Sequence, residues 1–269
     1  ILTEQSIGRL FMAGIIPGIL LTCLFLLAIA IVTKIKPEIG PVGPESSFIE
    51  KIKSLRRALA MVAIVVATIG GIYMGIFTPV EAAGVGALLA FCVALYRKSL
   101  DREKMTFVIL QTLQTTATVF MILIGAHVFI PFMALTHIPA DMVSFLVELD
   151  VGKMGVILLI LAVYIVLGTF LEGLAMLVLT LPITFEVITQ LGLSPIWFGI
   201  AVVIVLEMGL ISPPVGVNVF VVKSVAQDVP MGTIFRGIWP FWLAMGVCLA
   251  ILVVFPQIAT FLPDTMFGT

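Results

Sequence analysis

This sequence contains few charged residues. Only 11% of its 269 residues are charged, against about 25% in a soluble domain. Apolar residues make up 61% and the mean hydropathy is +1.28. No water-soluble fold buries that much apolar surface, so lipid is expected to surround most of the chain. The net charge of −1 lacks the positive surface with which proteins bind nucleic acid, so no nucleic acid partner is expected.

The residues of catalytic and metal sites are also scarce. The three cysteines, Cys23, Cys92 and Cys248, lie far apart in apolar runs and have neither metal-site nor disulfide spacing. The two histidines, His127 and His137, are too few to form a metal site alone. There is no serine–histidine–carboxylate set and no phosphate-binding loop. The sequence therefore predicts neither an enzyme nor an ATPase, and no cofactor.

Long apolar runs dominate the sequence instead. A bilayer core takes about 20 apolar residues as a helix. Spans are predicted at residues 10–32, 58–77, 80–96, 106–135 and 237–261, a short interfacial helix at 47–57, an amphipathic interfacial segment at 140–149, and a short tail after 261. Thr78 and Pro79 predict a tight turn, and Glu81 fits the first turn of the helix that follows, where a carboxylate satisfies free N–H groups. The pattern indicates an all-α integral membrane protein.

The segment 153–190 has two apolar arms that are each short for a span. The residues between the arms read GTFLEG, at 168–173. Gly168 and Gly173 permit unusual backbone conformations, Thr169 offers a hydroxyl, and Glu172 is an ionisable group in an apolar stretch. Either the arms are a pair of thin transmembrane helices, or they form a re-entrant hairpin whose tip lies near mid-membrane, inside protein or beside water. Glu172 has a structural interpretation as well, facing a water-filled cleft or pairing with a neighbour.

The segment 195–226 is long enough to span but is interrupted in its middle. Two adjacent prolines remove two backbone donors and cannot lie inside a regular helix, so two half-helices with an unwound link are predicted. Free carbonyls and the C-terminal end of the first half-helix suit a cation, and the N-terminal end of the second suits an anion. The candidate binding residues of this link are Gly209, Ser212, Pro213, Pro214, Gly216 and Asn218.

Lysine and arginine predict the orientation, because cytoplasmic loops are enriched in them. Twelve of the fourteen lie at 34–57, at 97–104, or at Lys223 and Arg236. One threading places all three groups in the cytoplasm, with the segment 153–190 opening to the outside and the broken span running inward. Two full membrane spans in place of the re-entrant hairpin would leave the three basic groups on the same side. Charge therefore does not decide between the hairpin and the two spans.

Ionisable side chains in the apolar runs support a second interpretation. Glu172, Glu207 and His127 would form the relay of a proton-coupled carrier or channel. Glu207 fits a buried carboxylate bonded to backbone equally well, and a histidine at position 127 is more often a packed polar residue. A third interpretation is a structural membrane subunit with no site of its own.

Several strings resemble the large membrane subunit of the TRAP (tripartite ATP-independent periplasmic) transporters. They are GGIYMGIFTPVEAAGVGA at 70–87, LGTFLEGLAMLVLTLPI at 167–183, EMGLISPPVGVNVFVV at 207–222 and FPQIATFLP at 255–263. The opening SIGRLFMAGIIPG at 6–18 also matches, and in that family it lies mid-chain. This mid-chain match and the start at Ile1 without methionine lead us to expect a fragment that lacks the family's first half. Small departures are Ser212 where the family often has threonine and Glu172 where it often has aspartate.

The resemblance implies an inverted-repeat, elevator-type transporter, like the ion transporter superfamily, with a re-entrant helical hairpin and a broken transmembrane helix. The implied domains are the last helix of the first repeat (1–33), a cytoplasmic loop with an interfacial helix (34–57), scaffold helices of the second repeat (58–149), the transport-domain hairpin and broken helix (150–226), and a final helix with a periplasmic tail (227–269).

The resemblance also implies sodium-coupled import of organic anions across the inner membrane of a bacterium or archaeon. The usual substrates are C4-dicarboxylates, other carboxylates, keto acids or sialic acid. The implied partners are a small four-helix membrane subunit, a periplasmic substrate-binding protein, the substrate and lipid. The sodium candidates are Gly168, Thr169, Gly209, Ser212 and Pro213, so that the tip at 168–173 and the link at 209–218 frame one site.

Overall fold

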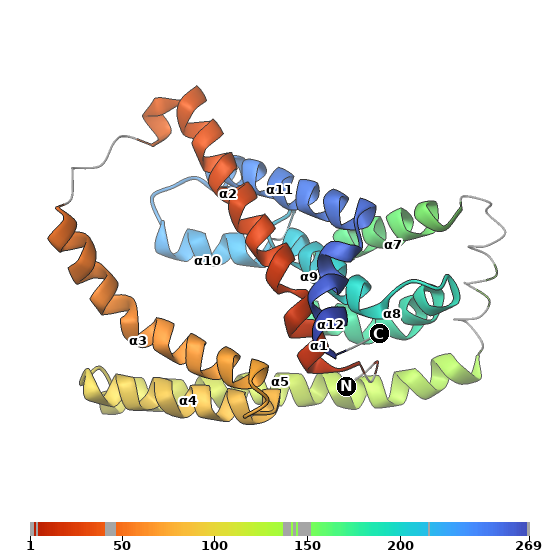
Figure 1. Ribbon diagram of the computed structural model, residues 1–269, viewed down its shortest axis with the longest axis horizontal. Coiled ribbons are helices and arrows are strands. Elements are labelled where there is room, and N and C mark those ends of the chain that lie inside the picture. The colour runs from red at the N-terminus through yellow and green to blue at the C-terminus, as the bar shows by residue number, and fades with distance from the viewer. Residues whose placement is uncertain are drawn as a thin grey trace. The chain divides into compact units, whose positions relative to one another are not determined.

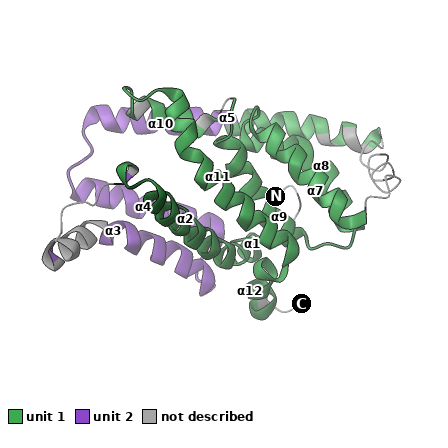
Figure 2. Cartoon of the chain, turned by 90° about the horizontal axis from the view of Figure 1, so that it is seen from above, with its two compact units in different colours: residues 1–39, 119–269 green, residues 40–118 purple. Residues whose placement is uncertain are grey.

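The computed structural model describes residues 5–40, 47–136, 152–214 and 216–267, together with positions 3, 141 and 144. All regular structure in these residues is helical (Figure 1). The chain divides into two compact units, residues 1–39 with 119–269 and residues 40–118 (Figure 2). Five described helical segments are long and apolar enough to cross a membrane, namely Ile7–Ile35, Pro79–Tyr96, Arg102–Phe129, Gly173–Gln190 and Met231–Val254. The prediction of an all-α membrane protein is confirmed.

The unit 40–118 contains α3 (Phe48–Tyr73), α4 (Pro79–Tyr96) and the start of α5 (Arg102–Leu135). The predicted turn before α4 is confirmed as a capping box: the Glu81 N–H donates to Thr78 Oγ1 at 3.3 Å, and the Thr78 N–H donates to Glu81 Oε2 at 2.8 Å. The predicted division into an interfacial helix at 47–57 and a separate span at 58–77 is wrong. Neither proline nor glycine interrupts residues 48–69, so the chain stays one helix until Tyr73, before Gly75 adopts a φ of +70°.

The other unit begins with α1 (Ile7–Ala13), α2 (Ile15–Ile35) and the 3-10 turn η1 (Pro37–Ile39). The span predicted at 10–32 lies within the helical segment Ile7–Ile35. Gly14 separates α1 from α2 in this segment, near Pro17, which has no N–H to donate to the carbonyl four residues earlier. Of the interfacial segment predicted at 140–149, all but positions 141 and 144 lies outside the described residues.

The remaining helices are α7 (Gly152–Gly168), α8 (Gly173–Gln190), α9 (Pro195–Leu210), α10 (Val217–Val225), α11 (Met231–Val254) and α12 (Gln257–Phe267). The span predicted at 237–261 is wrong at both ends: α11 starts earlier, with Arg236 inside it, and stops before Pro256. Residues 262–267 of the predicted tail instead belong to the helix α12, which packs against α1.

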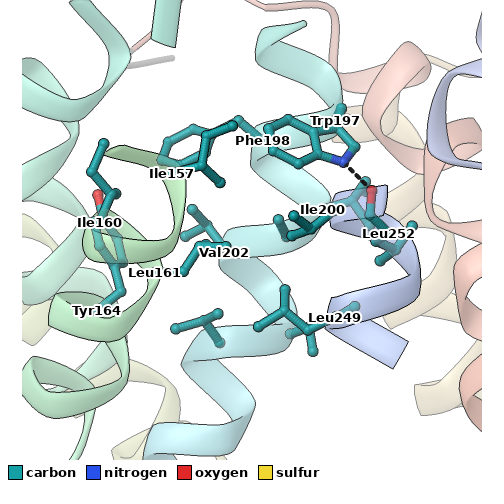
Figure 3. Close-up of a cluster of buried hydrophobic side chains, with 14 of the residues drawn as sticks. Ile157, Ile160, Leu161, Tyr164, Trp197, Phe198, Ile200, Val202, Leu249 and Leu252 are labelled. Atoms are coloured by element: carbon teal, nitrogen blue, oxygen red, sulfur yellow. Dashed lines mark hydrogen bonds between the residues drawn. The ribbon is translucent and has the colours of Figure 1, made fainter. Parts of the chain in front are cut away.

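Helix α9 is the centre of the core and packs against α7 and α11. Figure 3 shows Trp197 and Phe198 of α9 between the two neighbouring helices. The Trp197 Nε1–H donates to the carbonyl of Leu252 at 2.7 Å. That carbonyl has no partner within its own helix, because the residue four positions later is Pro256. The packing of these three helices holds the ends of α7 and α9 that carry the candidate site.

Candidate functional site

The hairpin tip consists of four residues, 169–172, between α7 and α8. Thr169 is 9% exposed and its hydroxyl donates to the Val166 carbonyl at 2.7 Å, which holds the side chain against the end of α7. Glu172 is exposed, and its Oε2 accepts the Ala175 N–H at 3.1 Å as the N-cap of α8. The carboxylate thus satisfies a free helix-end donor, which is a structural role that its position directly before a helix indicates.

The interrupted span has the predicted form, with α9 ending at Leu210 and α10 beginning at Val217. The link begins with a tight turn, in which the Ser212 N–H donates to the Gly209 carbonyl at 2.9 Å. The peptide bond between Pro213 and Pro214 is cis. Gly216 has a φ of +57° at the start of α10, a conformation that favours glycine.

Two glycines bring the tip and the link together. A Cβ placed on Gly209 would lie 2.7 Å from both the Cα and the carbonyl carbon of Gly168, and one placed on Gly168 would lie 3.3 Å from the Cα of Gly209. The last turn of α7 and the last turn of α9 therefore meet backbone to backbone. At Gly209 a Cβ would force the backbones apart, whereas at Gly168 it would require only a small shift. The two predicted loops are therefore neighbours.

Ser212 lies at the centre of the link and is 5% exposed. Its hydroxyl donates to the Met208 carbonyl at 2.6 Å and accepts the indole Nε1–H of Trp242 at 2.8 Å. Among the hydrogen bonds of the described residues, none reaches the carbonyl oxygens of Thr169, Ser212 or Pro213.

A cavity of about 380 Å³ opens beside the tip and the link. The tip supplies Thr169 and Phe170, and the link supplies Ser212 and the two prolines. The aromatic side of the cavity comes from α11, with Phe235, Trp239 and Trp242. None of the described residues that line this cavity is a carboxylate, a basic residue or a histidine.

Comparisons with known proteins decide the family. The profile of the family described as "Tripartite ATP-independent periplasmic transporter, DctM component" matches residues 1–258. The chain belongs to this DctM family. It is 34% identical over 97% of its length to the C4-dicarboxylate TRAP transporter large permease of Pseudomonas aeruginosa, and 34% identical over 100% of its length to the sialic acid TRAP transporter large permease of Vibrio cholerae.

A third DctM relative is the ectoine/5-hydroxyectoine TRAP transporter large permease of Ruegeria pomeroyi, at 30% identity over 100% of this chain. The chain spans 61%, 62% and 62% of the lengths of these three relatives. As a DctM protein it is a component of a transporter rather than an enzyme, and its place is the inner membrane, as predicted.

The predicted site residues of this DctM chain fall into two groups. The structure brings together Gly168, Thr169, Gly209, Ser212, Pro213 and Pro214 at the contact of the tip with the link. Gly173 instead packs α8 against α9, where a Cβ would lie 3.3 Å from Leu206 Cδ2, and a Cβ on Gly216 would lie 3.1 Å from the Ser212 carbonyl oxygen. Asn218 is exposed in the first turn of α10.

The residues of the predicted proton relay lie elsewhere. Glu172, Glu207 and His127 are all exposed, and none of them lines the cavity. The His127 Nδ1 is 2.9 Å from the carbonyl of Leu123, one turn earlier in its own helix. This local bond is the ordinary one for a polar side chain within a helix.

Trp242 is the site residue that the sequence did not reveal. It lies thirty positions after Ser212 in an apolar helix. A tryptophan in such a helix is ordinarily interpreted as a packing residue. The only available signal is its type, since a buried indole N–H needs an acceptor.

Proposed function

We propose that this chain is part of the large permease of a sodium-coupled symporter that imports organic anions. The observation that supports this proposal best is the backbone contact of Gly168 with Gly209, which joins the end of α7 before the hairpin tip to the end of α9 before the link. Interrupted helices are how many secondary transporters present backbone groups to ions and substrates. Because the chain spans about six tenths of its relatives, the proposal concerns the whole transporter of which this chain carries one site.

Sodium would bind between the tip and the link. Thr169, Ser212 and Pro213 offer carbonyl oxygens, and Ser212 adds a hydroxyl oxygen. All are hard ligands, the class that hard cations bind. The C-terminal end of α9 adds a partial negative charge from its terminal carbonyls. The Gly209 carbonyl, which accepts the N–H groups of Ile211 and Ser212, would hold the link in place beside the ion.

The substrate carboxylate would bind nearby, at the N-terminal end of α10. Helix N-termini attract anions through their free N–H groups and the helix dipole. The N-terminus of α8 is already occupied by the carboxylate of Glu172, whereas the N-cap of α10 is Gly216, which has no side chain to block it. Asn218 in the same turn would add an amide donor.

The order of binding follows from these positions. Sodium would first draw the carbonyls of the tip and the link together, and the anion would then meet an organised α10 terminus. This coupling requires no titratable group, which favours sodium over the proton-coupled alternative that uses Glu172 and Glu207. An elevator movement of the hairpin and broken helix, the inverted repeat, a small membrane subunit and a periplasmic binding protein complete the proposal by likeness to the family. Carboxylates are the proposed substrate class.

The test is sodium-dependent uptake by the reconstituted transporter with Ser212→Ala or Thr169→Ala. Both variants are expected to raise the sodium concentration for half-maximal uptake, with less effect on protein abundance. Ser212→Ala removes the hydroxyl ligand, and Thr169→Ala removes the bond to the Val166 carbonyl that holds the tip against α7. Ser194→Ala is the matched control, because the Ser194 hydroxyl caps α9 by accepting the Trp197 N–H at 3.4 Å, outside the tip and the link. Wild-type sodium curves in both test variants would refute the assignment.

A further inference from the structure

We propose that Trp242 is a positioning residue that holds the Ser212 hydroxyl as a hydrogen-bond acceptor toward the link, so that this atom admits a cation and not an anion. The inference deepens the proposed function and rests on it. It depends on two hydrogen bonds, Trp242 Nε1–H to Ser212 Oγ at 2.8 Å and Ser212 Oγ–H to the Met208 carbonyl at 2.6 Å.

The directions of these bonds are fixed by chemistry. An indole N–H is a donor only, so Ser212 Oγ must accept from Trp242. A carbonyl is an acceptor only, so the single hydroxyl proton of Ser212 must point to Met208. A hydroxyl has one proton and two lone pairs. One lone pair therefore remains, and no proton is left for a ligand.

The surroundings hold this arrangement in place. Ser212 is 5% exposed, so little water competes for its hydroxyl. Trp242 belongs to the long helix α11, and its ring packs edge-to-face on Trp239 with centroids 5.4 Å apart and an interplanar angle of 66°. Both indoles line the cavity beside Ser212. The direction of the N–H is thus set by a helix that does not belong to the hairpin or the link.

The remaining lone pair suits a cation. An anion at the same place would face only lone pairs and gain no hydrogen bond from this hydroxyl. Without the indole N–H, only the bond to the Met208 carbonyl orients the hydroxyl, which can then rotate and donate its proton to water or to an anion instead. Removal of the indole N–H alone is therefore expected to weaken cation binding without removing any atom of Ser212.

The experiment compares Trp242→Phe with Trp197→Phe in the reconstituted full transporter, in otherwise wild-type protein and together with Ser212→Ala. Trp197→Phe is the matched control, because it also removes one indole N–H hydrogen bond, the one that Trp197 donates to the Leu252 carbonyl at 2.7 Å, away from the link. Sodium titrations of uptake give the half-saturating sodium concentration, and uptake at saturating sodium gives the maximal rate.

Trp242→Phe is expected to raise half-saturating sodium by about three- to tenfold, the range for one lost hydrogen bond, with a smaller change in maximal rate. Added to Ser212→Ala it is expected to cause less than about a twofold further change. Trp197→Phe is expected to lower thermal stability and leave half-saturating sodium unchanged.

A wild-type sodium curve in Trp242→Phe, or an equal shift with and without the Ser212 hydroxyl, would overturn the inference while the proposed function stands. Wild-type uptake that is independent of sodium would overturn both, so the two failures are distinguishable.

Discussion

Alanine at Gly209 is the most direct perturbation of the contact between the hairpin tip and the broken helix. Its Cβ would lie 2.7 Å from the Cα and the carbonyl carbon of Gly168 and 2.9 Å from the carbonyl oxygen. Non-bonded carbon atoms prefer about 3.5–4.0 Å, so the ends of α7 and α9 must separate by roughly 0.8 Å or more. The atoms on the other side are backbone, which has no rotamer to change.

Two terms decide the magnitude of this effect. Overpacking of a well-packed interior costs about 1–3 kcal/mol. Gly209 lies in the last turn of α9, where alanine regains at most about 1 kcal/mol of helix propensity. Because the opposing atoms are backbone, the overpacking cost is taken at its upper end of about 3 kcal/mol, and the expected net loss is about 2 kcal/mol. Uptake is expected to fall roughly tenfold or more, because the two loops are displaced from each other.

Thermal unfolding of the purified protein and uptake by proteoliposomes measure the two effects. Gly246→Ala in α11 is the matched control, because its Cβ would meet Met208 Cε at 3.9 Å, an ordinary contact. We expect Gly246→Ala to keep wild-type stability and uptake. Wild-type stability and uptake in Gly209→Ala would refute the reasoning, since the backbone contact would then not constrain the site.

Three further substitutions test other parts of the account by thermal unfolding. Trp197→Phe is expected to cost about 1–3 kcal/mol, because the Leu252 carbonyl is left buried without a donor; an unchanged midpoint would contradict this. Thr78→Ala is expected to cost about 1 kcal/mol through loss of the capping box with Glu81. Thr78→Ser keeps the hydroxyl and should retain most of the stability that the capping box provides. Gly216→Ala is expected to cost about 1–2 kcal/mol at a φ of +57°, with close contacts of the new Cβ to the Ser212 carbonyl oxygen at 3.1 Å adding to the loss; an unchanged midpoint would argue against this explanation.

The two halves of the site could be predicted from local sequence. The double proline at 213–214 interrupts any helix, and the six residues GTFLEG at 168–173 separate two apolar arms. Both interruptions are properties of a few consecutive residues, and the structure has them where the sequence places them. The tight turn before α4 was predictable for the same reason, because a threonine, a proline and a glutamate form its cap.

That those halves frame one site was implied only by the family resemblance, and no local pattern in the sequence shows their contact. Gly168 and Gly209 are both consistent with local flexibility, and only the packing of α7 on α9 shows that each is needed for the other. Trp242 was missed for a related reason, since its role depends on a hydrogen bond across helices. The role of Glu172 as the N-cap of α8 was missed because an ionisable residue in an apolar run first suggests function.

Helix ends were predicted least well, because charge was taken as a boundary. The basic stretch before residue 58 continues into α3, and Arg236 lies inside α11. A helix tolerates charged residues on a water-facing side or near a membrane surface. Helix interruption instead follows proline and glycine, as at Gly14 and Pro256.

The most direct test of the central claim is uptake of a carboxylate by the reconstituted transporter under imposed ion gradients. An inward sodium gradient without a proton gradient is expected to drive accumulation, and a proton uncoupler is expected to leave it intact. Uptake that persists without sodium and collapses on adding the uncoupler would contradict the account, and would return the coupling role to Glu172 and Glu207.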